Sequence, residues 1–237
     1  FLEEYAEIPT SVYLASEYRY SKTFSDNKTL TILISQSGET ADTLAALRKA
    51  KQNNIDTLGI INTVGSSIAR EALNVFYIKV GCEVSVATTK AYSAQVLILM
   101  LIALSIASKK GIINEEIANK YLNDIKKIPS LITKEINNKD TYYKIANLIY
   151  NKNDVFFLGR GIDYYLCMEA SLKLKEISYI HSESYAAGEL KHGTISLISE
   201  GTPVIGLVTN HDLAMKSISN IKEVKARGAF VIFVTLD

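Results

Sequence analysis

One group of side chains in this 237-residue sequence is suited to binding a phosphate. The hexapeptide Ser35-Gln36-Ser37-Gly38-Glu39-Thr40 separates a short apolar run from a helical pattern. Helix N-termini offer unpaired N–H groups and a partial positive charge, and Ser and Thr hydroxyls add further donors. An ordinary turn whose Ser or Thr caps a helix has the same composition, so the residues alone leave both readings open. No Gly-Lys-Ser/Thr follows and no GxGxxG is present, which excludes a Walker loop and a dinucleotide fingerprint.

A second group is suited to moving a proton. Glu169, Lys173 and Glu176 are spaced i, i+4, i+7 and therefore share one face of a helix. Interconverting a ketose and an aldose moves a proton between C1 and C2, which requires a positioned base. A cation beside that base keeps it ionised and stabilises an enediolate-like charge. A solvated stripe of salt bridges has the same spacing, so this alternative also stays open.

The stretch 180–193 collects two of the three histidines, His181 and His192, with two Glu, one Lys and two Gly. A connection this rich in ionisable groups favours a functional loop. The spacing of 11 between the histidines fits no helical ligand pair and no Cys lies nearby, so we predict no metal and no cofactor. His181 and Glu183 either support the site or make local structural hydrogen bonds. His211, at the start of a predicted helix, is assigned to the surface.

The elements that position these groups alternate along the chain. Apolar, β-branched runs predict strands and 3.6-residue periodicity predicts helices. Strands alternating with helices of ten or more residues imply parallel doubly wound sheets, whose ligands bind at the carboxyl ends of the strands. Strands are predicted at 30–34, 57–61, 75–80, 155–158, 203–208 and 230–236, and helices at 41–54, 88–110, 115–128, 141–151, 163–179 (with Asp163 as N-cap) and 212–227.

These elements form two similar halves, 1–127 and 140–237, each predicted as a three-layer α/β/α unit. A polar stretch at about 126–140, which contains Pro129, is the predicted linker. Both candidate acid–base groups belong to the second half, whereas the candidate phosphate turn belongs to the first.

Bulk composition excludes several classes. A net charge of +1 gives no electrostatic footprint for nucleic acid or an anionic membrane. The longest apolar stretch, 96–107, is shorter than the roughly 20 residues of a membrane span, so we predict a buried helix. Two cysteines without a CxxC pair indicate a reducing compartment, the cytosol. The start at Phe1 has neither an initiator Met nor a basic segment, so we expect no signal peptide and a chain cut inside a helix.

The residues 35–47 resemble the phosphosugar-binding signature of sugar isomerase (SIS) domains, in the form found in glutamine–fructose-6-phosphate aminotransferases. A second stretch, 86–92, is similar to that family's V-A-S-T-K-A-F, with Thr88 in place of Ser and Tyr92 in place of Phe. The resemblance implies that the sugar phosphate is held by Ser35, Gln36, Ser37 and Thr40, with Ala87 and Thr88 contacting the sugar.

The resemblance is most specific over 172–181 and 186–193, where only Thr194 replaces the family's following Pro. It implies that Glu176 is the base for the C1/C2 proton and that Lys173 is its assisting cation. It also implies that His192 opens the sugar ring and reaches into the neighbouring subunit's site, which requires a homodimer.

Taken over the whole chain, the resemblance implies two SIS subdomains that convert fructose 6-phosphate and glutamine-derived ammonia to glucosamine 6-phosphate, in UDP-GlcNAc biosynthesis. Three parts of that family are expected to be missing here. These are the glutaminase domain, the opening strand of the first half before Phe1, and a lysine-bearing tail beyond Asp237.

Two other classes stay open. A regulatory SIS module senses phosphosugars with the phosphate turn alone, and needs neither a base nor a ring opener. A stand-alone SIS isomerase or deglycase has both groups but no glutaminase domain.

Overall fold

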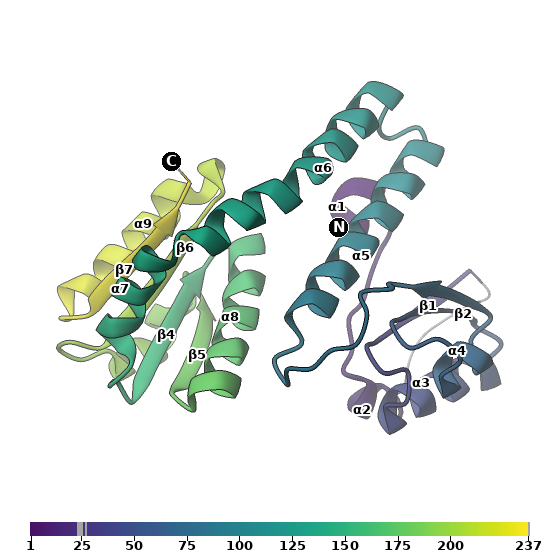
Figure 1. The fold of residues 1–237 in the computed structure, drawn as a ribbon, viewed down its shortest axis with the longest axis horizontal. Coiled ribbons are helices and arrows are strands. Elements are labelled where there is room, and N and C mark those ends of the chain that lie inside the picture. The colour runs from purple at the N-terminus through teal and green to yellow at the C-terminus, as the bar shows by residue number, and fades with distance from the viewer. Residues whose placement is uncertain (23–25, 27, 237) are drawn as a thin grey trace. The chain divides into compact units, whose positions relative to one another are not determined.

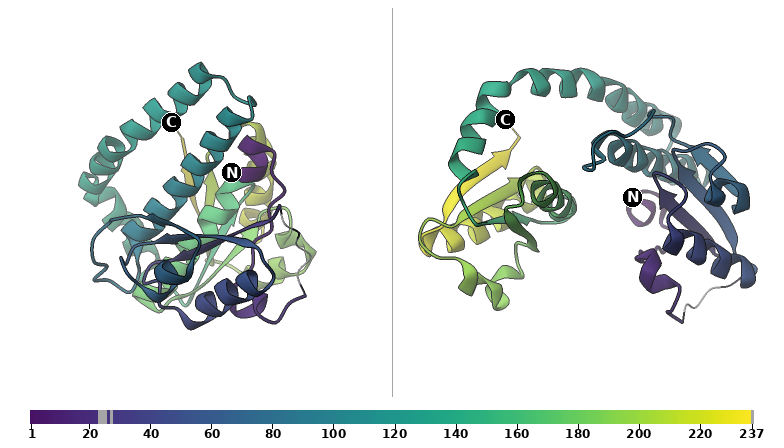
Figure 2. Two further views of the ribbon diagram at one scale, coloured as in Figure 1. Left: turned by 90° about the vertical axis from the view of Figure 1, so that its right-hand side faces the viewer. Right: turned by 60° about the horizontal axis from the view of Figure 1, so that its bottom comes forward.

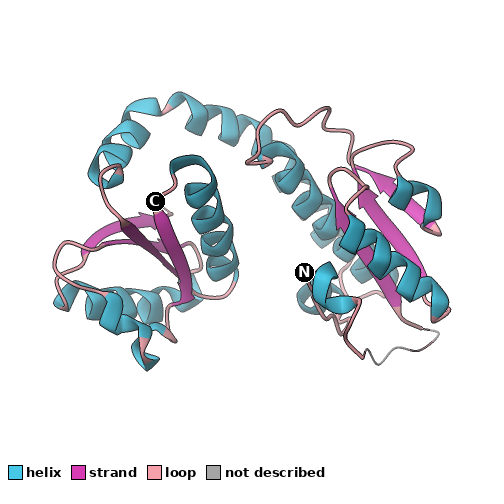
Figure 3. Ribbon diagram, turned by 90° about the horizontal axis from the view of Figure 1, so that it is seen from below, coloured by secondary structure: helices cyan, strands magenta, loops and turns pink. Residues whose placement is uncertain are grey.

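The computed structural model describes residues 1–22, 26 and 28–236, which divide into two compact units, Phe1–Lys127 and Ile128–Asp237 (Figure 1). Each unit has its own parallel sheet with helices beside it, which confirms the predicted α/β class (Figure 3).

The first unit is built on a parallel sheet of order β1-β2-β3, in which Leu30 lies opposite Asp56 and Leu58 opposite Asn74. Inward residues of the strands and helices form a buried cluster that includes Leu33, Leu47 and Ile61. The elements are α1 (Leu2–Ala6), α2 (Ala15–Tyr18), β1 (Leu30–Ser35), α3 (Ala41–Gln52), β2 (Asp56–Ile61), α4 (Ser67–Glu71), β3 (Asn74–Tyr77), α5 (Thr89–Lys109) and the start of α6 (Glu115–Asn137).

Helix α5 is the apolar helix that the sequence predicts as buried. It packs against α1 and buries Ala91, Ile98, Ala103, Leu104 and Ala107. With 21 residues and a mean hydropathy of 1.9, it is also long and apolar enough to cross a membrane. The core helix of a soluble protein passes the same test, and 28% of the most apolar 18-residue window of α5 is buried in this structure.

The second unit is a three-layer α/β/α sandwich on a parallel sheet of order β5-β4-β6-β7 (Figure 1). Helix α8 packs on β4 and β5, and α9 packs on β6 and β7. Two separate buried clusters, one containing Phe156 and Val224 and the other Phe157 and Cys167, show that both faces of the sheet are covered. The elements are α7 (Lys139–Ile149), β4 (Asp154–Gly159), α8 (Ile162–Ser178), β5 (His181–Ala186), the short 3₁₀ helices η1 (Leu190–His192) and η2 (Thr194–Leu197), β6 (Pro203–Val208), α9 (His211–Ala226) and β7 (Phe230–Thr235).

The predicted helix end at Ile128 is wrong, because α6 is one unbroken helix through Pro129 to Asn137 (Figure 2). A proline inside a helix removes one backbone hydrogen bond. The apolar repeat of Ile125, Ile128, Ile132 and Ile136 nevertheless continues across it with i+3 and i+4 spacing, which keeps one helical face apolar. Most of the predicted linker is therefore helical.

Two further local expectations are corrected. The helix α8 begins at Ile162 with Gly161 as its N-cap, so Asp163 lies in the first turn and does not cap. Strand β5 was not predicted, because His181, Ser182, Glu183 and Ser184 are polar. As an edge strand paired only with β4, β5 does not need the apolar sequence of a central parallel strand.

Candidate active site

The phosphate turn, which we define as residues 35–40, lies at the carboxyl end of β1 and leads into α3. Its side chains bond to its own backbone: the Gly38 N–H donates to Ser35 Oγ (3.0 Å), and the Glu39 N–H donates to Ser37 Oγ (3.2 Å). The Ser35 and Thr40 hydroxyls lie 3.3 Å apart. Three of the four predicted phosphate-binding side chains therefore lie in or beside one hydrogen-bonded turn, and Gln36 lies between them.

Thr40 is the N-cap residue of α3, but its side chain makes no capping hydrogen bond. The ordinary capped turn, which the sequence leaves open, would direct this hydroxyl to an N–H of the first helical turn. Instead it lies next to Ser35, so the N-terminal amides of α3 are not occupied by it. This arrangement favours an anion at the helix terminus.

Gly38 is held tightly against the next loop of the sheet. Its φ of +67° lies in the left-handed region, and an added Cβ would come within 2.0 Å of Ser66 Oγ. The Ile68 N–H donates to the Gly38 carbonyl (3.0 Å), and the Ser67 N–H donates to Glu39 Oε1 (2.8 Å). The first turn of α4, together with its N-cap residue Ser66, therefore fixes the phosphate turn from outside.

Ala87 and Thr88 immediately precede α5. Ala87 is buried, and Thr88 is the N-cap residue in the left-handed conformation (φ 49°) without a side-chain cap. Its hydroxyl donates to the Val86 carbonyl (3.1 Å). The carboxylate of Glu83 takes the capping role, accepting from the Ala91 N–H at 2.8 Å.

The three ionisable residues of α8 lie together on one face, as their spacing predicts. Lys173 Nζ is 2.6 Å from Glu176 Oε2 and 3.5 Å from Glu169 Oε1, and the three side chains are only 22–26% exposed. Burial by itself lowers the pKa of Lys173, but the hydrogen bond to Glu176 and the charges of both carboxylates outweigh it and raise that pKa. Lys173 therefore stays an ammonium ion, and the solvated salt-bridge stripe is disfavoured by the partial burial.

His192 ends the 3₁₀ helix η1, on a different element of the second unit. Leu190, in the same short helix, is buried in the core and anchors it, whereas His192 is exposed. The His192 ring makes no hydrogen bond within the part of the chain that the structure describes.

His181 and Glu183 lie on β5, where His181 begins the strand. His181 Nδ1 is 2.7 Å from Asp154 Oδ1, at the first residue of β4, and Glu183 accepts a hydrogen bond from the Tyr185 hydroxyl. Burial and then this hydrogen bond raise the pKa of Tyr185 to about 12. Because the amino ends of β4 and β5 lie opposite the edge where parallel sheets bind ligands, the alternative of structural hydrogen bonds is favoured for His181.

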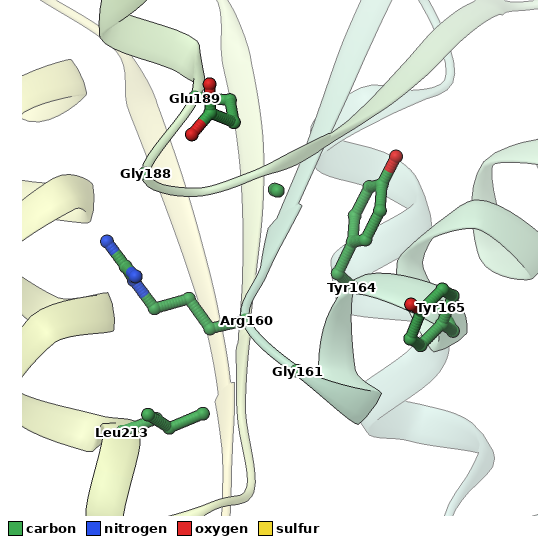
Figure 4. Close-up of a pocket in the computed structure, with 8 residues that line it drawn as sticks. Arg160, Gly161, Tyr164, Tyr165, Gly188, Glu189 and Leu213 are labelled. Carbon is green, nitrogen blue, oxygen red and sulfur yellow. The ribbon is translucent and has the colours of Figure 1, made fainter. Parts of the chain in front are cut away.

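At the carboxyl ends of β4 and β5, the second unit has a cavity of about 220 Å³ (Figure 4). Arg160 lines this cavity, and its Nη2 and Nε donate hydrogen bonds to Asn220 Oδ1 at 2.9 and 3.2 Å. Its guanidinium group also lies against Gly188, where an added Cβ would come within 2.7 Å of Nη2. Arg160 thus supports the loop that leads to η1.

Sequence reasoning missed Asn62, Ser66 and Arg160. Each of them directly follows a strand or lies in the loop after it, at the carboxyl edge of its sheet. The rule that ligands bind at that edge could have selected them.

The SIS domain family matches residues 1–105 and 148–237 of the chain. The chain is 52% identical over 231 residues to the glutamine–fructose-6-phosphate aminotransferase [isomerizing] of Caldanaerobacter subterraneus, covering 98% of this chain and 38% of that protein. It is 50% identical to the protein of the same name from Clostridium tetani, covering 100% and 39%. The chain thus spans about two fifths of the length of these curated relatives.

Solved structures agree with these matches. The C-terminal domain of glucosamine-fructose-6-phosphate aminotransferase from Francisella tularensis superposes with a TM-score of 0.95 and 40% identity, covering 99% of this chain and 66% of that one. Glucosamine-6-phosphate deaminase from Thermotoga maritima superposes with a TM-score of 0.77 at 24% identity, which shows the fold alone.

Proposed function

Because this chain belongs to the SIS domain family, we propose that it is the sugar-isomerising part of a glutamine–fructose-6-phosphate aminotransferase. The substrate is fructose 6-phosphate, the nitrogen donor is ammonia released from glutamine, and the product is glucosamine 6-phosphate. Relatives that carry this name are 45–52% identical over nearly the whole chain.

In this proposal the phosphate of the sugar binds in the phosphate turn. The uncapped N-terminus of α3 supplies amides and a partial positive charge, and Ser35, Ser37 and Thr40 supply hydroxyls. Gln36, in the same turn, also holds the phosphate, and the 87–88 segment contacts the sugar.

The proton transfer is assigned to α8. Glu176 takes the proton from C1 of the sugar and returns it to C2, while the Lys173 ammonium group beside it stabilises the negative charge that develops on the sugar. The half-buried Lys173–Glu176 pair is the observation that carries the enzyme proposal. A phosphosugar-sensing module needs the phosphate turn but has no use for such a base.

His192 is proposed to open the sugar ring in the site of the neighbouring subunit, so the active protein is a homodimer. A glutaminase domain elsewhere in the gene product supplies ammonia, no cofactor is required, and the protein works in the cytosol.

The test is turnover of fructose 6-phosphate by the full-length gene product. We expect glucose 6-phosphate to form without glutamine and glucosamine 6-phosphate to form with it. Replacing both Ser37 and Thr40 with Ala should weaken fructose 6-phosphate binding at least tenfold, since two hydrogen bonds to a charged group are lost. Binding without turnover would identify a sensor, and isomerisation that never uses glutamine would identify a stand-alone isomerase.

A further inference from the structure

Three loops meet at the carboxyl edge of the first unit's sheet, because its three strands are parallel and adjacent. The loop after β1 is the phosphate turn. The loop after β2 begins with Asn62, and the loop after β3 runs through Gly81 to Ala87 and Thr88. The first and third loops carry the proposed substrate contacts, and the second lies between them.

Asn62 is bonded to both neighbouring loops. Its backbone N–H donates to the Gln36 carbonyl in the phosphate turn (3.2 Å). Its side chain accepts from the Val80 N–H through Oδ1 (3.1 Å) and donates to the Gly81 carbonyl through Nδ2 (2.6 Å). Both the oxygen and the nitrogen of the Asn62 side-chain amide therefore form hydrogen bonds with the loop after β3.

From Gly81 the connection continues into the first turn of α5. The Cys82 carbonyl accepts from Lys90 Nζ (2.7 Å), and Glu83 Oε1 accepts from the Ala91 N–H (2.8 Å). Since the Thr88 side chain does not cap its own helix, these two bonds hold the start of α5. The position of Thr88 thus follows the position of Gly81, which Asn62 fixes.

The phosphate turn has supports of its own that do not involve the Asn62 side chain. Gly38 and Glu39 are held by the N–H groups of Ile68 and Ser67, and Gln36 is held by the backbone N–H of residue 62, which any residue except proline provides there. Truncating the Asn62 side chain should therefore release the loop after β3 and leave the turn in place.

We infer that Asn62 is a positioning residue, which sets the distance between the phosphate turn and the Ala87–Thr88 segment and so aligns the sugar carbons while the phosphate is anchored. This inference rests on the proposed function for its choice of ligand. It assigns to the side-chain amide of one residue the coupling between two parts of the substrate site.

The experiment compares Asn62→Ala with Asn53→Ala in the full-length gene product. Asn53 is exposed at the end of α3 and makes no side-chain hydrogen bond within the described residues, so it controls for the loss of an amide. Calorimetric titration with fructose 6-phosphate should show affinity about tenfold weaker in Asn62→Ala, because the two side-chain hydrogen bonds that hold the loop after β3 in place are lost. Inorganic phosphate, which needs only the turn, should bind within about twofold of the wild type. Equal loss for both ligands, or loss for neither, would overturn the inference.

Amide hydrogen exchange gives a readout that does not depend on the ligand. In Asn62→Ala we expect faster exchange across 80–91, including the Val80 and Ala91 amides, with unchanged exchange at 36–40. Unchanged exchange across 80–91 contradicts the inference. If the wild type binds neither ligand, the proposed function fails, and the exchange experiment still decides whether Asn62 couples the two loops.

Discussion

At the scale of single residues, the charge state of Lys173 decides what α8 can do. Burial lowers the pKa of Lys173, but Glu176 and Glu169 raise it by a larger amount. The pKa of Lys173 is therefore higher in the folded protein than in the unfolded chain. A raised lysine pKa contributes stability that is fully present below the unfolded value of about 10.4, and this stability is lost as the pH rises through the folded pKa. Throughout the neutral range Lys173 is a fixed cation beside a carboxylate.

Replacing that carboxylate tests its role directly. Glu176→Gln keeps the size of the side chain but removes the base, so we expect isomerisation of fructose 6-phosphate to fall by about 10²–10⁴-fold, the usual contribution of general base catalysis. Substrate affinity should remain, because the phosphate turn is unchanged. A coupled assay with glucose-6-phosphate dehydrogenase measures the rate of isomerisation, and calorimetry measures the affinity for the substrate. The control is Glu116→Gln, which removes an exposed carboxylate outside the candidate site. Unaltered turnover in Glu176→Gln would remove Glu176 from the mechanism.

The two cysteines should differ in reactivity. Burial, and then the charge of Asp163, raise the pKa of Cys167 to about 12, whereas Cys82 is exposed. Only the thiolate is alkylated, so at pH 8 iodoacetamide should label Cys82 in the folded protein and reach Cys167 only after denaturation. Peptide mass spectrometry measures this, with Cys82→Ser as the control that should take no label when folded. Equal labelling rates would show that the β4–α8 region opens readily.

At the scale of elements, Asp163 links α8 to the end of β6. Its buried carboxylate accepts from the Thr209 N–H (2.8 Å) and from the Thr209 hydroxyl (2.5 Å). The residue therefore joins the first turn of α8, which follows β4, to the segment that follows β6, and β4 and β6 are the neighbouring strands at which the strand order reverses. Its role is to hold two elements together, which the N-cap interpretation did not anticipate.

Removing this carboxylate should destabilise the second unit. Asp163→Ala leaves the partly buried Thr209 N–H without its hydrogen-bond partner, and we expect a loss of about 1–3 kcal/mol in the free energy of unfolding. Thr209→Val removes only the hydroxyl and should cost less, about 0.5–1.5 kcal/mol. Urea denaturation followed by circular dichroism measures both. A smaller loss in Asp163→Ala than in Thr209→Val would show that the link is unimportant.

At the scale of the whole molecule, the proposal requires two subunits to complete one site. Glu176→Gln and His192→Ala should each be inactive alone. In a mixed dimer, one site receives both intact residues and the other receives neither. If equal amounts of the two variants exchange subunits at random, the mixture should therefore recover about a quarter of wild-type activity, as a two-fold symmetric dimer requires. The measurement is turnover after co-refolding an equimolar mixture, with each variant refolded alone as the control. No recovery would place both residues in the site of one subunit and refute the exchange of His192.

The periodicity of the elements and the local spacing of the chemical groups could be predicted from the amino-acid sequence. Apolar β-branched runs located β1, β2, β4 and β6 to within a residue or two. The strands β2, β4 and β6 lie inside their sheets and are largely buried, which requires such residues. The i, i+4, i+7 spacing on α8 already placed Glu169, Lys173 and Glu176 on one face, because helix geometry is local. The family motifs in the same segments indicated which groups to test.

The contacts between groups on different strands and loops could not be predicted, because they depend on how the chain folds. Edge strand β5 takes its strand conformation from pairing with β4, and no apolar pattern in its own residues predicted it. Whether Thr40 caps α3 depends on Ser35 beside it, and the role of Asn62 depends on loops at Gln36 and at 80–81 that are far from it in the chain. Such contacts follow from the order and register of parallel strands, which bring the ends of distant segments to one edge.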